Sequence, residues 1–190
     1  MMRTFIAAVS LLTVACSGSP TGPTQSGSAT LNVRITDSPF EDAKAVLVTF
    51  DAVSVHKAGG EGWTTVPFAD GTSRTCDLKK LEGAQDVLGV GALTPGHYTQ
   101  IRLIVASAAL YFTNGTPPLG PACAAVIAPP AGDHASLEIS SGEVKLNRQF
   151  DLVAGDATTI TLDFDGNRSI RETAPGRYRM RPVIGVVSVQ

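Results

Sequence analysis

The sequence predicts an all-β fold, an antiparallel β-sandwich of the immunoglobulin-like or prealbumin-like kind with one short helical turn. Segments in which apolar and polar residues alternate recur along the chain, and this period of two is typical of strands with one buried face. Turn formers separate these segments, because the chain contains 19 Gly and 12 Pro. Helical periodicity is almost absent. A β-barrel is the alternative architecture that these observations leave open.

The first expected strand covers residues 31–35, where every second residue is apolar. A second alternating segment covers residues 46–55, and its apolar phase slips by one residue at positions 51–52, which predicts a β-bulge. The helical turn follows at residues 78–81, where Asp77 can cap the first turn and Gly83 can end it.

Two further strands are expected at residues 99–105 and 160–164, which alternate in the same way. Residues 93–98 lead into the first of these and have the pattern of a tyrosine corner, in which the Tyr98 hydroxyl bonds the backbone upstream. A tyrosine that only packs at the start of a strand is the alternative. The last strand is expected at residues 177–189, and its second half is apolar on both faces, which predicts a central position in its sheet.

The N-terminus predicts a lipoprotein signal peptide at residues 1–15. Arg3 precedes an apolar run that is too short for a membrane-spanning helix of ~20 residues, and small Ala15 stands directly before Cys16. Residues 12–16, Leu-Thr-Val-Ala-Cys, resemble the lipobox of bacterial lipoproteins, which implies lipidation of Cys16. Thr13 stands where the lipobox prefers Leu, so cleavage without lipidation is the alternative.

The segment 16–28 then comprises the lipidated Cys16 and a flexible tether rich in Gly, Ser and Pro, and residues 29–190 form a single domain. We therefore expect a cell-envelope protein, held by its lipid to a membrane as its first partner. The absence of Asp after Cys16 fits delivery to the outer membrane, by resemblance to well-studied lipoproteins.

Once Cys16 is assigned to the lipid, Cys76 and Cys123 remain as an even pair in an oxidising compartment, which predicts a disulfide. Two free, buried thiols are the alternative. The bond would hold the Pro-rich segment 114–134, which is longer than an ordinary loop of a compact domain and is therefore a candidate contact surface.

Composition and motifs exclude several functions. A net charge of -2 lacks the basic excess of nucleic-acid-binding proteins. The chain carries no nucleophile elbow, zinc-protease motif or phosphate-binding loop, so we predict neither catalytic residues nor a cofactor. His56, His97 and His134 lie in separate segments. Asp163 to Asn167 opens like a calcium loop, but Arg168 replaces the required Gly, so no metal site is predicted.

Arginines concentrate near the C-terminus. Arg177, Arg179 and Arg181 fall on one face at period two, and Arg168 and Arg171 precede them. The functional hypothesis is a site for an anionic envelope ligand, such as an acidic polysaccharide or a lipid headgroup, because guanidinium groups suit carboxylate and phosphate. A solvated strand face paired with acidic neighbours is the alternative.

Several segments together resemble the secreted bacterial and archaeal lipoprotein family that carries domain of unknown function 4382. These segments are residues 35–39, 46–50, 53–56, 76–78, 95–103, 161–165, 169–170 and 181–184. The resemblance implies an extracytoplasmic β-sandwich module with no established activity. In this family we expect a shorter segment, with less Pro, in place of residues 114–134.

The predicted function is thus a non-catalytic binding or assembly module of the cell envelope, which recognises a glycan, another polymer or a protein. An extracytoplasmic hydrolase is the alternative, and a pocket with convergent carboxylates, or with a His beside a Ser, would favour it. The sequence does not predict the oligomeric state.

Overall fold

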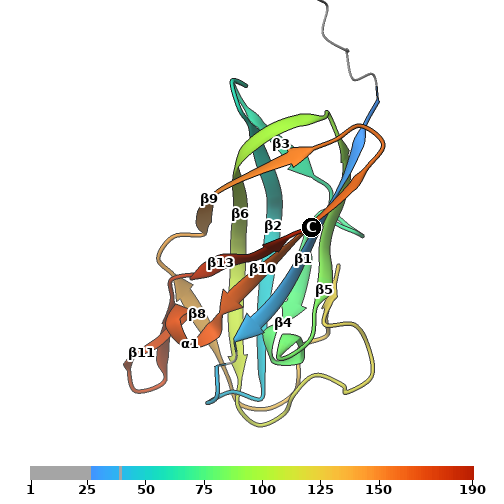
Figure 1. Ribbon diagram of the computed structural model, residues 1–190. Coiled ribbons are helices and arrows are strands. Elements are labelled where there is room, and N and C mark those ends of the chain that lie inside the picture. The colour runs from blue at the N-terminus through green and yellow to red at the C-terminus, as the bar shows by residue number, and fades with distance from the viewer. Residues whose placement is uncertain (1–26, 39) are drawn as a thin grey trace, which may run out of the picture.

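The computed structural model describes residues 27–38 and 40–190, which form strands with two short helical segments (Figure 1). The predicted signal peptide, Cys16 and most of the tether lie outside the described residues. The elements are β1 (Ala29–Ser38), β2 (Ala45–Lys57), β3 (Trp63–Val66), β4 (Arg74–Asp77), η1 (Leu78–Leu81), β5 (Asp86–Leu93), β6 (Gly96–Tyr111), β7 (Cys123–Ala124), β8 (His134–Ile139), β9 (Glu143–Leu152), β10 (Ala157–Asp165), α1 (Gly166–Ser169), β11 (Ile170–Ala174), β12 (Arg177–Met180) and β13 (Ile184–Val189).

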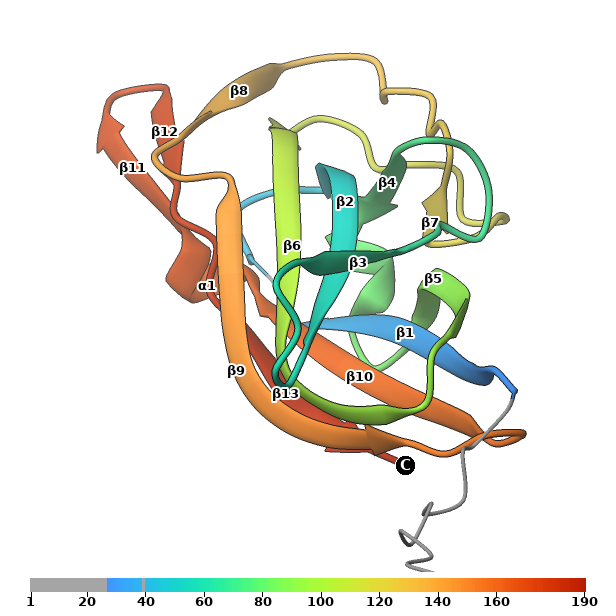
Figure 2. The same ribbon diagram turned by 90° about the horizontal axis from the view of Figure 1, so that it is seen from above.

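The strands form two packed sheets that do not close into a barrel, so the predicted all-β sandwich is confirmed (Figure 2). The small sheet has the order β13-β10-β1-β5. The large sheet has the order β11-β12-β8-β6-β2-β4-β7, with β3 paired to β2 and β9 paired to β6. The sheets are not purely antiparallel, because β1 pairs in parallel with β10, and β12 in parallel with β8.

The core lies between the two sheets and is filled by the alternating residues of their strands. Leu31 and Ile35 of β1 and Phe164 of β10 are fully buried, and Phe164 meets Phe50 of β2 edge to face, with ring centroids 6.4 Å apart. The predicted β-bulge is present, because the register of β2 against β6 shifts between Phe50 and Ala52.

The predicted tyrosine corner is confirmed. The Tyr98 hydroxyl donates to the Thr94 carbonyl oxygen over 2.8 Å, and the Tyr98 ring stacks on Phe150 with centroids 5.3 Å apart. Burial raises the pKa of Tyr98 above its usual value. This residue therefore fixes the turn before β6 to the core beneath β9.

The predicted helical turn is η1, where the Asp77 side chain accepts from the Lys79 N–H. The sequence analysis did not predict the second helical segment, α1. Asp165 caps α1 as Asp77 caps η1, because its side chain accepts from the Arg168 N–H. Nowhere in residues 27–38 and 40–190 is there a helix with the length and apolar character needed to cross a membrane.

The prediction of one central strand at residues 177–189 was wrong. The segment divides into β12, which belongs to the large sheet, and β13, which is an edge strand of the small sheet. Pro182 lies between them and has no backbone N–H to continue a ladder, so the chain changes sheets there. Val187 of β13 is 62% exposed, as expected of an edge position.

The predicted disulfide joins Cys76 of β4 to Cys123 of β7, with the Cα atoms 4.0 Å apart. It ties the segment 114–134 to the large sheet. Thr116 adds a second attachment, because its hydroxyl donates to the buried Asp77 carboxylate over 2.6 Å. Leu119, further along the segment, is 91% exposed.

Candidate functional site

A groove of about 1030 Å³ lies between β9 and the segment that runs from α1 to β13. We call it the basic groove, because five cationic side chains line it: Lys145, Arg168, Arg171, Arg179 and Arg181. Val144, Leu146 and Ile184 are among the apolar residues that also line it. The groove thus combines positive charge with apolar contact area, a combination that suits an extended anionic ligand.

Strand pairing brings two of the arginines face to face. β11 and β12 form an antiparallel hairpin in which Arg171 is directly opposite Arg179. Like charges at directly opposite positions destabilise a strand pair. The Arg179 guanidinium is partly neutralised by Glu138 of β8, whose two oxygens lie 3.1 and 3.3 Å away. An anionic ligand would relieve the remaining repulsion.

Ser169 positions the part of the groove that follows β12. This buried residue accepts from the Arg181 N–H with its carbonyl over 2.8 Å, and from the Val183 N–H with its hydroxyl over 2.8 Å. The two bonds fix the backbone on both sides of Pro182 against α1. Arg181 therefore leaves a well-defined backbone, although its side chain extends into solvent.

The charge of the groove is only partly balanced. Arg168 lies 3.8 Å from Asp165, and Lys145 lies 3.3 Å from Glu143. These pairs are exposed and contribute at most about 1 kcal/mol each. Neither Arg171 nor Arg181 forms an ion pair with any residue that the structure describes. The groove therefore keeps a net positive charge.

The predicted stripe of Arg177, Arg179 and Arg181 is divided by the structure. Arg179 and Arg181 line the basic groove, and Arg179 also lines an adjoining hollow of about 510 Å³ together with Arg177 and His134 of β8. Arg177 and Arg179 share one face of β12 and line the same hollow, whereas Arg179 and Arg181 reach the groove beside β9. Sequence reasoning missed Lys145, because no local signal shows that β9 borders the arginines.

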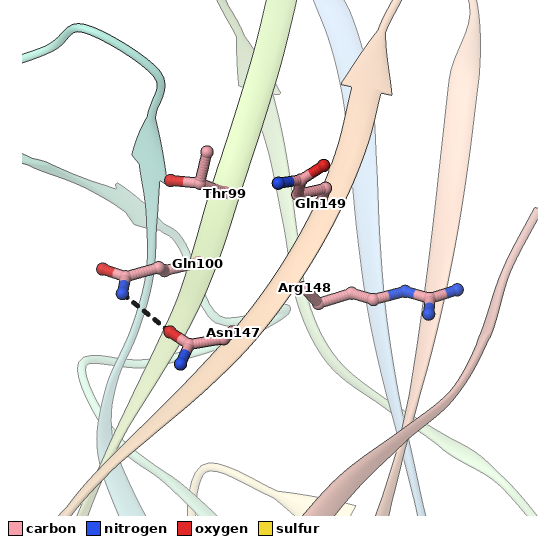
Figure 3. A pocket seen from close by; sticks show the side chains of 5 residues that line it. All are labelled: Thr99, Gln100, Asn147, Arg148 and Gln149. Atoms are coloured by element: carbon pink, nitrogen blue, oxygen red, sulfur yellow. Dashed lines mark hydrogen bonds between the residues drawn. The ribbon is translucent and has the colours of Figure 1, made fainter.

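A second hollow, of about 520 Å³, lies where the register of β6 against β9 shifts. Gln100 donates through Nε2 to Asn147 Oδ1 over 2.8 Å, and Thr99 and Gln149 complete this polar surface. Figure 3 shows that Arg148 points away from Gln100 and Asn147. No motif in the sequence indicated this place.

Each of the three histidines contacts a different neighbour. His97 Nδ1 lies 2.8 Å from Asp151 Oδ1 in an exposed pair, and His134 stacks on Tyr111. No histidine side chain is bonded to a serine or cysteine side chain within residues 27–38 and 40–190. The same residues include no group of three or more His, Cys, Asp or Glu side chains that could hold a metal ion.

One buried carboxyl group is electrostatically unusual. Asp37, at the end of β1, is 6% exposed, and neither of its oxygens has a hydrogen-bond partner among the described residues. Burial raises its pKa from 3.8 to about 8, and the charge of Asp163 adds to the effect. The Gly166 N–H, which points toward the carboxyl without forming a regular hydrogen bond, and the charge of Lys79 lower the pKa only in part. Sequence reasoning quoted this residue only as part of a family segment and missed its burial.

Comparison with known proteins gives one match. No curated protein matches the chain, and no solved structure matches it. The family model described as "Domain of unknown function (DUF4382)" matches residues 28–182, which include β1 to β12. The chain belongs to the DUF4382 family, as the segments of its sequence predicted.

Proposed function

We propose that the protein is a non-catalytic binding module of the cell envelope, anchored by a lipid at Cys16, which holds an acidic polysaccharide in its basic groove. The observation that carries this proposal is the pair of arginines without carboxylate partners, Arg171 and Arg181, within a groove of about 1030 Å³. Guanidinium groups bind carboxylates through two parallel hydrogen bonds, which gives both affinity and orientation.

Two features favour a polysaccharide over a lipid headgroup. Val144, Leu146 and Ile184 lie among the cations, and such apolar side chains can contact the faces of sugar rings. The Gly/Ser/Pro composition after Cys16 also predicts a tether of roughly 20 Å, which would hold the domain clear of the bilayer. A ligand that projects from the envelope fits this arrangement better than a headgroup in the membrane surface.

Binding of polygalacturonate to the full mature protein tests the proposal. We expect measurable binding by calorimetry that weakens as salt is added, because exposed charges are screened. The double variant Arg171→Gln, Arg181→Gln should weaken binding by about tenfold or more. The single variant Arg177→Gln, whose side chain lies outside the groove, is the control and should bind as the wild type does.

Two outcomes would contradict the proposal. Binding that the double variant retains in full would show that the groove is only a solvated surface. Vesicles containing phosphatidylglycerol provide the other comparison. If they bind the protein in the same groove while polygalacturonate does not, the ligand is a lipid headgroup.

The lipid anchor is tested separately. The intact mass of the mature protein should correspond to a chain that begins at lipidated Cys16. The variant Cys16→Ser should leave the membrane fraction and keep the Cys76–Cys123 disulfide, because that bond lies within the folded domain. A mature chain with an unmodified Cys16 would overturn this part of the proposal.

A further inference from the structure

The outward face of the large sheet carries a row of polar and aromatic side chains across β3, β2, β6 and β9, which pair in this order. Figure 2 shows β2, β6 and β9 side by side. Trp63 of β3 is directly opposite His56 of β2, which is opposite Gln100 of β6, which is opposite Asn147 of β9. Val55, the neighbour of His56 along β2, is buried in the core, so the row points outward. We call these four residues the polar row, and it spans about 14 Å at the usual strand spacing.

Trp63 is held in place before any ligand binds. The Arg102 guanidinium lies 4.5 Å from the centroid of the indole ring, and the His56 ring meets the indole edge to face at 5.5 Å. Arg102 is itself oriented, because its Nε donates to the Ser54 hydroxyl over 3.1 Å. The half-buried indole is therefore an ordered surface, and little side-chain freedom is lost when a ligand packs on it.

The other end of the row offers hydrogen bonds without charge. Gln100 and Asn147 share one bond of 2.8 Å and keep further amide donors and acceptors that no residue described in the structure occupies. The hollow of about 520 Å³ lies beside them, and Figure 3 shows the two amides pointing to the same side of β6 and β9. A ligand hydroxyl has room to reach both amides.

The two cations next to the polar row share one carboxylate, in contrast to Arg171 and Arg181 of the basic groove, which form an ion pair with none of the described residues. Glu143 lies 3.3 Å from Lys145 and 3.7 Å from Arg102, the two cations in the neighbouring row of the sheet. The polar row itself contains no Asp or Glu, Lys or Arg. An aromatic ring at one end, amides at the other and no charged residue between them suit a ligand that is neutral, rich in hydroxyls and apolar on one face.

We propose that the polar row binds a neutral, linear polysaccharide chain, with a sugar ring packed on Trp63 and sugar hydroxyls hydrogen-bonded to Gln100 and Asn147. A pyranose ring has an apolar C–H face for the indole and a rim of hydroxyls for the amides. The row crosses the strands in a straight line, so successive sugar units of one chain can contact its two ends. This site is separate from the basic groove, because none of the four residues lines that groove.

The single tryptophan of the chain makes the site directly observable, since the tryptophan fluorescence, excited selectively at wavelengths that tyrosine does not absorb, comes from Trp63 alone. We expect one or more of three neutral probes, cellohexaose, xylohexaose and mannohexaose, to shift the emission saturably. Added salt should not change the affinity, because the probes carry no charge. This independence of salt separates the polar row from the basic groove.

The variants locate the binding. Gln100→Ala keeps the fluorophore and should weaken binding by about tenfold, and Trp63→Ala, followed by calorimetry, should abolish it. Thr64→Ala is the matched control, because Thr64 is exposed on the same strand and points to the opposite face from Trp63. Circular dichroism shows whether each variant is folded.

The proposal is overturned if none of the three hexasaccharides changes the emission or releases heat at millimolar concentrations. It is equally overturned if a hexasaccharide binds and the Trp63 and Gln100 variants bind it as the wild type does. Loss of polygalacturonate binding in the Arg171, Arg181 double variant concerns the basic groove alone and leaves this test unaffected.

Discussion

Replacing Asp37 with Asn is expected to stabilise the protein at alkaline pH and to have little effect at acidic pH. The Asp37 carboxyl is 6% exposed and has no hydrogen-bond partner among the described residues, so its ionised form is poorly solvated. Burial and the charge of Asp163 raise its pKa from 3.8 to about 8. Asn has nearly the same shape and carries no charge at any pH.

The sign and the size of the effect follow from the two pKa values. The folded protein binds the Asp37 proton more tightly than the unfolded chain does, so the stability that this proton contributes is complete below the unfolded value of 3.8. It is lost as the pH rises through the folded value of about 8. At about 1.4 kcal/mol per pH unit, the free energy of unfolding of the wild type should fall relative to Asp37→Asn by at most about 4 kcal/mol between about pH 5 and pH 9.

Urea unfolding of the wild type and Asp37→Asn over this pH range measures the difference directly. Asp51→Asn is the control, because Asp51 is an exposed carboxylate on β2, and the gap between this variant and the wild type should not widen toward alkaline pH as it does for Asp37→Asn. Asp163→Asn should narrow the gap between wild type and Asp37→Asn, because it removes the second cause of the raised pKa. The reasoning is refuted if that gap is the same at acidic and alkaline pH.

Three further predictions concern stability. Replacing Cys76 and Cys123 with Ser should lower the free energy of unfolding by about 4 kcal/mol for a closed loop of 47 residues, and thermal unfolding with and without reductant should agree with the variant. Asp77→Ala removes the acceptor of three hydrogen bonds and should cost about 3 kcal/mol in urea unfolding, so a loss below about 1 kcal/mol would contradict this account. Gly142→Ala would press its Cβ against a backbone carbonyl oxygen of β6 and should cost about 1 to 3 kcal/mol, whereas Gly62→Ala, in open space, should not.

The parts of the fold that were predictable depend on short stretches of sequence. Alternation over residues 31–35 and 160–164 placed β1 and β10, because a half-buried strand needs that pattern wherever it lies. The slip of phase at residues 51–52 predicted the bulge for the same reason. The tyrosine corner is also local, because the Tyr98 hydroxyl bonds a carbonyl only four residues upstream.

Features that depend on distant segments could not be read from such patterns. The parallel pairing of β1 with β10 joins residues more than a hundred positions apart, and nothing near either strand specifies the neighbour. The apolar residues of β13 suggested a central strand, yet Val186 and Val189 pack on the core from an edge position. Apolar character on two faces shows that a strand is partly covered, and it does not show which strand lies beside it.

The same limit explains why the positive charge of the candidate site was predictable from the sequence, whereas the set of residues that line the site was not. The arginines near the C-terminus are visible in the sequence, but the groove is formed where the chain leaves one sheet at Pro182 and enters the other. Lys145 of β9 joins Arg179 and Arg181 there, whereas Arg177 lines the adjoining hollow, which Arg179 shares. The strand period therefore predicted which arginines share a face of β12, and it could not predict which of them lie beside β9.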